Sequence, residues 1–294
     1  MRWLMAALLL FALPVAVLAD TARPPQVAFL NHSFAVLDAE TADAIEHSDY
    51  LKTFGVVEVQ TTVANAGETW RGRYLSGRQT YLEFFGPADL KDAPAGSTGF
   101  AISPDKAGGL AVMKTRLIRN GMAHPDAALR TKQLGKDQVP WFNLIAPPGE
   151  PKWLSVWAME YVPSYFDDPR AGKEPAEYPG DISRERYRSD AYTGKLMRDV
   201  STIEIGAAVD DIAMARSMLV AAGFRVTVQA DGLTARDADT TIVLRKVSDA
   251  DAGMRRITFR LNRQAAEVHV EQIGHSTLTV GSGAEAVWVF QPQH

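Results

Sequence analysis

Residues 29–38 read Phe-Leu-Asn-His-Ser-Phe-Ala-Val-Leu-Asp, and residues 80–87 read Thr-Tyr-Leu-Glu-Phe-Phe-Gly-Pro. Both stretches are rich in apolar and aromatic residues, as expected of buried strands, yet each has one titratable side chain near its centre, His32 or Glu83. A buried imidazole or carboxylate is costly unless another group binds it. The sequence between them predicts one helix followed by further strands. His32 and Glu83 therefore lie on the first and last strands of a predicted strand–helix–strand–strand–strand unit.

A weak repeat of this unit organises the rest of the chain. Three times an apolar strand leads to an Asp suited to cap a helix, and the helix ends at a Gly. The predicted caps are Asp38, Asp105 and Asp210, and the terminal glycines are Gly55, Gly121 and Gly223. A fourth stretch, residues 255–290, has strand patterns but leaves no room for a helix. We therefore predict an α+β fold of four such units, the last of them degenerate.

The chain divides into four predicted segments. Residues 1–19 combine an early positive charge, an apolar run and small residues at the end, which is typical of a signal peptide. Residues 20–165 form a first domain, residues 166–200 a linker with a helix over Ile182–Arg198, and residues 201–294 a second domain. The apolar run is shorter than the ~20 residues that span a bilayer. We expect a periplasmic or secreted protein without a membrane partner after cleavage.

Composition excludes several classes of function. Among 294 residues, 31 are Lys or Arg and 35 are Asp or Glu, and no basic cluster occurs, which argues against nucleic acid as a partner. The chain has no cysteine, so disulfides and thiolate chemistry are excluded. The commonest zinc-protease, serine-hydrolase and P-loop motifs do not occur. The arginines of the predicted helix over 182–198 are expected to face water.

The candidate site residues fall on the predicted strands. Strand alternation places Leu30, His32 and Phe34 on one face. Glu160, in Val-Trp-Ala-Met-Glu-Tyr-Val, occurs at the end of the second unit, as Glu83 does in the first. One imidazole and two carboxylates suit a divalent ion such as Mn²⁺, Fe²⁺, Ni²⁺ or Zn²⁺ with positions open for substrate oxygens. Alternatively, a backbone carbonyl satisfies His32 in a core and Glu83 faces outward.

Four aromatic residues are candidates for a substrate pocket, with Glu160 as a candidate base. They are Tyr74, Tyr81, Trp141 and Trp157. The same residues also suit the packed core of a barrel, so either role is open.

The pattern Phe-Leu-Asn-His…Trp-Arg-Gly-Arg-Tyr-Leu-Ser-Gly…Thr-Tyr-Leu-Glu-Phe-Phe, followed by Pro-Trp-Phe and Trp-Ala-Met-Glu-Tyr, resembles the vicinal-oxygen-chelate superfamily. This superfamily includes glyoxalases, bleomycin-resistance proteins and extradiol dioxygenases, and the chain is most similar to an uncharacterised glyoxalase-like family. The resemblance implies tandem domains of βαβββ modules with metal ligands on the first and fourth strands of each module. His32, Glu83 and Glu160 match three such positions, whereas Gly99 falls at the fourth and cannot bind a metal.

Three functions remain open at this point. The first is a metal-dependent enzyme of lyase, isomerase or dioxygenase type acting on a small oxygen-bearing substrate. The second is a metal-free protein that binds or sequesters a small molecule, as bleomycin-resistance proteins do. The third is a structural envelope protein whose cavity is filled by side chains. Fold resemblance does not choose among them, because function depends on the site.

Overall fold

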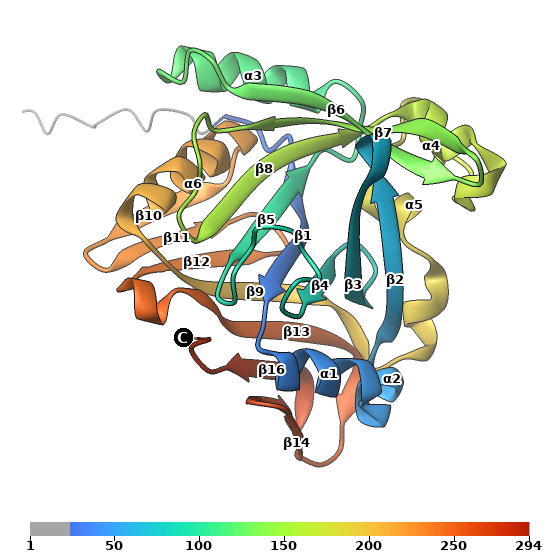
Figure 1. Cartoon of the computed structure of the whole chain (residues 1–294), viewed down its shortest axis with the longest axis vertical. Helices are drawn as coiled ribbons and strands as arrows, with labels where there is room; N and C mark the ends of the chain where they lie inside the picture. The colour runs from blue at the N-terminus through green and yellow to red at the C-terminus, as the bar shows by residue number, and fades with distance from the viewer. Residues whose placement is uncertain (1–23, 294) are drawn as a thin grey trace, which may run out of the picture.

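The computed structural model describes residues 24–293; the predicted signal peptide, residues 1–19, lies outside them. The fold is α+β, with one closed eight-stranded barrel and one eight-stranded sheet (Figure 1). None of the helices in the described part of the chain is both long and apolar enough to cross a bilayer.

The barrel is built by the first half of the chain. Its strands are β1 (Phe29–Val36), β2 (Val56–Ala64), β3 (Glu68–Ser76), β4 (Tyr81–Phe85), β5 (Thr98–Ser103), β6 (Asp126–Leu134), β7 (Asp137–Ala146) and β8 (Leu154–Tyr161). Their order around the barrel is β1-β4-β3-β2-β6-β7-β8-β5. In each half the first strand pairs in parallel with the fourth, β1 with β4 and β5 with β8. The halves join along β1 and β5, and on the other side through the single pair Ala64↔Lys132.

The second sheet is built by the second half of the chain. Its strands are β9 (Met197–Ala207), β10 (Arg225–Gln229), β11 (Gly232–Arg236), β12 (Thr241–Lys246), β13 (Gly253–Ala265), β14 (His269–Ile273), β15 (Ser276–Val280) and β16 (Gly283–Phe290). β9 pairs in parallel with β12, whereas β13 pairs antiparallel with β16. After β9 a helix returns the chain, so that β10 runs in the same direction as β9, and two further reversals make β12 parallel to β9. After β13 the chain reverses three times without a helix, which makes β16 antiparallel to β13.

Helices cover the outside of these sheets. They are α1 (Ala39–His47), α2 (Asp49–Phe54), α3 (Gly109–Arg119), α4 (Pro163–Asp167), α5 (Arg184–Tyr187) and α6 (Val209–Ala222), with short 3-10 turns η1 (Asn65–Gly67), η2 (Pro169–Ala171), η3 (Asp190–Gly194) and η4 (Asp249–Asp251). The predicted cap Asp38 is confirmed, since its carboxylate accepts from the backbone N–H of Thr41 at 2.9 Å. The predicted caps Asp105 and Asp210 are wrong, because α3 starts after Gly108 and α6 after Ala208.

One large core joins the two halves. Phe84, on the outer face of β4, lies 5.1 Å from Trp288 and 6.0 Å from Phe290 of β16, measured between ring centroids. Phe54 of α2 lies 5.4 Å from Phe259 of β13. The second sheet therefore supports the outer wall of the barrel on which β1 and β4 lie.

The segment between β8 and β9, which we call the strap (residues 163–196), differs from the prediction. The helix predicted over Ile182–Arg198 is wrong, because α5 spans only Arg184–Tyr187 and β9 already starts at Met197. Its arginines do not face water as expected: Arg184 is 3% exposed and Arg186 is 9% exposed. They are buried because the strap packs against the barrel rather than lying free on its surface.

Candidate functional site

A β-bulge directs His32 into the barrel. β1 pairs with β5 at Leu30↔Ile102 and next at His32↔Ala101, so Asn31 is an additional residue without a partner across the ladder. Such a bulge shifts the alternation of side chains by one residue. Leu30 consequently joins the core outside the barrel, whereas His32 lines the interior, and the prediction that both share one face is wrong.

Asn31 fixes the orientation and tautomer of the imidazole. Its side-chain N donates to Ser103 Oγ at 2.8 Å and to Tyr161 OH at 3.4 Å, which directs its Oδ1 toward His32 Nδ1 at 2.7 Å. An amide oxygen only accepts, so Nδ1 carries the proton and Nε2 keeps a lone pair. Burial, and secondarily the nearby Arg188 guanidinium, lower the pKa of His32 to about 3. The imidazole is therefore neutral at physiological pH.

Glu83 faces the same interior from β4. Its neighbours Leu82 and Phe84 belong to the core outside the barrel, so strand alternation places the carboxyl inside. Burial raises the pKa of Glu83 to about 7, although Arg188, Lys132 and a hydrogen bond from Tyr81 act in the opposite direction. The carboxyl group thus changes its protonation state near neutral pH, a property common among functional carboxyl groups.

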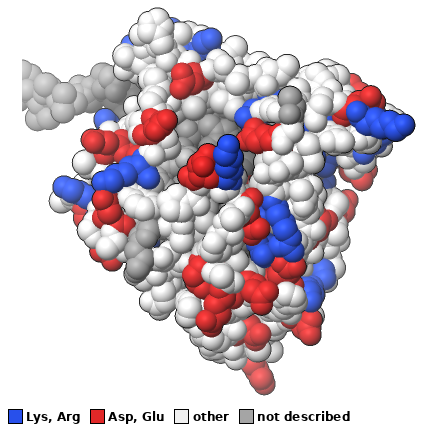
Figure 2. All heavy atoms as spheres, viewed as in Figure 1, with Lys and Arg blue, Asp and Glu red and all other residues white. Residues whose placement is uncertain are grey.

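His32 and Glu83 line a cavity of about 290 Å³ inside the barrel. The molecular surface is hollowed over this region (Figure 2). The other lining residues are the aromatic Phe34, Trp70, Tyr81, Phe85, Trp141, Phe142 and Trp157, the aliphatic Leu90, Leu144 and Met159, and the charged Glu68 and Arg130, which form an ion pair at 2.6 Å. Seven aromatic rings therefore surround two groups able to exchange hydrogen bonds with a bound molecule.

Three of the four predicted pocket aromatics line this cavity, namely Tyr81, Trp141 and Trp157. Tyr81 also stacks on the imidazole of His32, with ring centroids 4.5 Å apart. Tyr74 is buried beside the cavity instead, where its hydroxyl accepts from Trp70 Nε1 at 3.1 Å. Tyr74 thus positions a wall residue rather than facing a ligand.

Glu160 lies on the other face of the barrel wall. Trp157 and Met159 of β8 line the cavity, so alternation directs Glu160 outward. Its carboxylate accepts from the backbone N–H of Gly108 at 3.1 Å and of Leu110 at 2.8 Å, at the start of α3. A carboxylate at this end of a helix is stabilising. The structure therefore does not bring Glu160 together with His32 and Glu83, and assigns it a helix-capping contact instead of the predicted metal-binding and catalytic role.

The second half of the barrel offers no replacement ligands. His32 pairs with Tyr81, two residues before Glu83, and Gly99 pairs with Ser155, two residues before Trp157. The places equivalent to His32 and Glu83 thus hold Gly99 and Trp157. A Cβ at Gly99 would clash with the ring of Phe34, which occupies that space. Within residues 24–293 no group of three or more His, Cys, Asp or Glu side chains could hold a metal ion. The residues present therefore do not fit a divalent metal centre.

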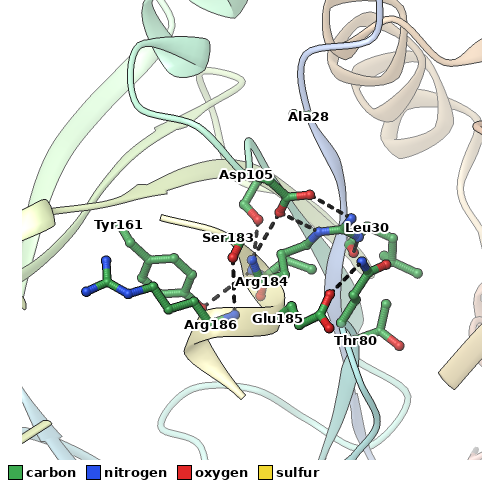
Figure 3. A network of polar contacts seen from close by, with 12 residues as sticks. Ala28, Leu30, Thr80, Asp105, Tyr161, Ser183, Arg184, Glu185 and Arg186 are labelled. Atoms are coloured by element: carbon green, nitrogen blue, oxygen red, sulfur yellow. Dashed lines mark hydrogen bonds and ion pairs between the residues drawn. The ribbon is translucent and has the colours of Figure 1, made fainter. Parts of the chain in front are cut away.

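The strap supplies contacts that the sequence did not reveal. Arg184 binds Asp105 through Nε at 2.9 Å and through Nη2 at 3.0 Å, and its Nη1 donates to the carbonyl of Leu30 at 2.7 Å (Figure 3). This buried network holds the strap against β1 directly before the bulge. Arg188 follows in the same segment and lies over Tyr81, 4.6 Å from its ring centroid. In the sequence, the Arg- and Tyr-rich composition of residues 184–188 is the signal that could have indicated these contacts.

A comparison with protein-family models matches residues 30–290 to a family described as a family of unknown function (DUF5829). The chain belongs to the DUF5829 family. No curated protein matches the chain significantly. The family therefore groups this fold without assigning it a ligand or a reaction.

Several solved structures are distantly similar to this chain. A hypothetical protein from Staphylococcus aureus has a TM-score of 0.49 and 11% identity, covering 88% of this chain and 97% of that chain. A halotolerant catechol dioxygenase has a TM-score of 0.42 and 8% identity, covering 92% and 89%. A mutant of 4-hydroxymandelate synthase from Streptomyces coelicolor has a TM-score of 0.39 and 12% identity, covering 76% and 64%. Likenesses this distant do not transfer a reaction to the DUF5829 chain.

Proposed function

We propose that this protein binds a small aromatic molecule inside the first barrel, without a metal ion. The observation that carries the proposal is the cavity of about 290 Å³, in which seven aromatic side chains surround His32 and Glu83. Its volume is at the lower end of ligand pockets, which are mostly apolar with a few convergent polar groups. Aromatic walls favour a planar ring through stacking and edge-to-face contacts, each worth about 0.5–1.5 kcal/mol beyond burial.

The two polar groups would orient the ligand. His32 Nε2 has a lone pair and accepts a hydrogen bond, for example from a ligand hydroxyl. Glu83 donates while protonated and accepts once ionised, and both forms are populated near its pKa of about 7. One further candidate, metal-free acid–base catalysis on the bound molecule, is favoured by this same titration near neutrality.

The metal-dependent enzyme that the resemblance implies has less support than metal-free binding, because Gly99, Phe34 and Trp157 occupy the places where further metal ligands would lie. The strand pairings favour four units related to βαβββ modules, with the second sheet supporting the wall that carries His32 and Glu83. Export through the signal peptide at residues 1–19 remains part of the proposal and would place the binding site outside the cytoplasm.

Binding is tested with chelator-treated full-length protein and phenylacetate, phenylacetamide, phenol and indole as probes. Trp70, Trp141 and Trp157 line the cavity, so their fluorescence reports occupancy. We expect saturable binding that Leu90→Trp weakens by partly filling the cavity. Leu129→Trp is the matched control, since Leu129 is 51% exposed and lies outside the cavity.

Absence of saturable binding by all four probes would refute the proposal. Binding of equal strength in Leu90→Trp would place the ligand elsewhere and refute it as well. Binding that appears only after Mn²⁺, Fe²⁺, Ni²⁺ or Zn²⁺ is added would favour the metal-dependent alternative.

A further inference from the structure

Three cations near the cavity form no ion pair with a carboxylate of residues 24–293. They are Lys132 on β6 and Lys173 and Arg188 on the strap, and within the described part of the chain none of them forms an ion pair. Other basic groups of this region are paired: Arg184 with Asp105, and Arg78 with Glu185 at 2.7 Å. All three unpaired cations are only partly exposed. Partly buried charges that form no close ion pair are costly, so the presence of three of them in one region needs an explanation.

Each cation lies over an aromatic ring of the same cluster. Lys132 Nζ is 4.8 Å from the ring centroid of Trp141, and the Arg188 guanidinium is 4.6 Å from that of Tyr81. Lys173 Nζ is 4.1 Å from the ring centroid of Tyr187, which lies 6.5 Å from that of Tyr81. Tyr81 and Trp141 are walls of the cavity. Two of the cations thus lie against rings that a ligand would touch.

Arg188 also retains an unused donor. One of its terminal nitrogens donates to Ser76 Oγ, but its Nε is buried and has no hydrogen-bond partner. Buried donors in folded proteins are nearly always paired, so an isolated one indicates an absent water, ion or ligand group. This observation is independent of the ring contacts and points to an acceptor near Arg188.

The positive charge reaches the cavity. Arg188 acts on both His32 and Glu83, lowering the pKa of each, and Lys132 acts on Glu83 in the same direction. Negative charge in the lining is limited, because Glu68 is paired with Arg130 and burial favours the neutral form of Glu83. The interior therefore has an excess of positive potential.

We infer that the cavity selects an aromatic ligand carrying a negative charge, such as an aromatic carboxylate, through the unpaired cations Lys132, Lys173 and Arg188. The inference rests on the proposed function, because it names the ligand class of the same cavity. Rings contribute most of the contact area, and the cations discriminate between ligands of equal shape. The charge of the ligand would also compensate cations that the protein leaves without partners.

The test compares phenylacetate, phenylacetamide and phenethylamine, which share a ring and a two-carbon side chain but differ in charge. Isothermal titration of the full-length protein at pH 6, where phenylacetate is ionised, is expected to give phenylacetate an affinity on the order of tenfold higher than phenylacetamide. Phenethylamine is expected to bind most weakly. Raising the salt concentration should reduce the preference for phenylacetate, since partly exposed charges are screened.

Two variants identify the source of the preference. Lys132→Met removes one cation while keeping an unbranched side chain, and Arg188→Gln removes another; each should reduce the ratio of phenylacetate to phenylacetamide affinity several-fold. Lys114→Met is the control, because Lys114 is exposed on α3 and the change in net charge is the same.

The outcomes separate this inference from the proposed function. If the three probes bind with equal affinity, charge selection is refuted while aromatic binding stands. If both variants keep the full preference, the assignment of the selection to these cations is refuted. If none of these three probes binds to the wild-type protein, the inference fails, and the proposed function fails with it when phenol and indole do not bind either. The comparison of probes on the wild-type protein needs no variant, so poor folding of Lys132→Met or Arg188→Gln does not prevent a decision.

Discussion

Replacing Glu83 by Gln should make the protein more stable at alkaline pH and leave its stability nearly unchanged at acid pH. Folding raises the pKa of this carboxyl from its ordinary 4.5 to about 7 because burial disfavours the charge. The folded state therefore binds the proton more tightly than the unfolded state. Stability contributed by the protonated group is fully present below pH 4.5 and is lost as pH rises through about 7.

The structure sets the size of the effect. A shift from 4.5 to about 7, at about 1.36 kcal/mol per unit, corresponds to roughly 3 kcal/mol of unfavourable free energy in the ionised folded protein. The cavity admits solvent to the carboxyl, so about 2–3 kcal/mol is expected. The amide introduced by Glu83→Gln would be neutral at every pH and would not incur this cost. His32 has a pKa shifted the other way, but it is common to both proteins and cancels in the comparison.

Urea unfolding of wild type and Glu83→Gln at pH 4.5, 6, 7.5 and 8.5 measures the difference. Glu285→Gln is the matched control, because Glu285 is exposed on β16 and loses the same charge. The unfolding free energy of Glu83→Gln relative to wild type should rise with pH by about 2–3 kcal/mol. A difference independent of pH, or one reproduced by Glu285→Gln, would refute the assignment of a buried carboxyl inside the barrel.

Three further predictions follow from the same structure. The affinity for phenylacetate should fall as pH rises through about 7, because ionised Glu83 repels the anion, and should vary little with pH in Glu83→Gln; titration calorimetry across this range checks both. Asp105→Asn leaves buried Arg184 without its ion partner and should lower the free energy of unfolding by about 3–5 kcal/mol; an unchanged denaturation midpoint would contradict the role given to this network. Gly99→Ala adds a Cβ that would clash with the ring of Phe34 and with the backbone oxygen of Ser155 and should cost about 1–3 kcal/mol, seen as a lower melting temperature; a neutral effect would contradict this close packing.

Much of the fold was predictable because its signals are local. Apolar runs followed by Asp and Gly marked the repeated units, although only Asp38 of the three predicted Asp residues caps its helix, and the missing helix of the last unit was visible from the lack of room within residues 255–290. The sequence left the orientation of Glu83 open, and the structure places its carboxyl inside the barrel. Both faces of β4 are buried. Glu83 faces the barrel interior, whereas Leu82 and Phe84 on the other face belong to the core between the barrel and the second sheet.

The remaining features depend on contacts that a single sequence does not encode locally. The bulge at Asn31 is visible only in the pairing of β1 with β5, and it changes which side chains share a face with His32. The outward direction of Glu160 depends on the register of β8 relative to β5. Arg184 and Arg188 have the composition of a solvated helix, and only the packing of the strap shows that one is buried and the other lies over Tyr81.

A crystal structure of the chelator-treated protein with 4-bromophenylacetate tests the central claim most directly, because the anomalous signal of bromine locates the ligand independently of the protein. We predict one strong bromine peak inside the first barrel, with the ring between Tyr81, Trp141 and Trp157 and with no metal at His32 and Glu83. A barrel interior without bromine, or a metal ion bound between His32 and Glu83, would contradict the account.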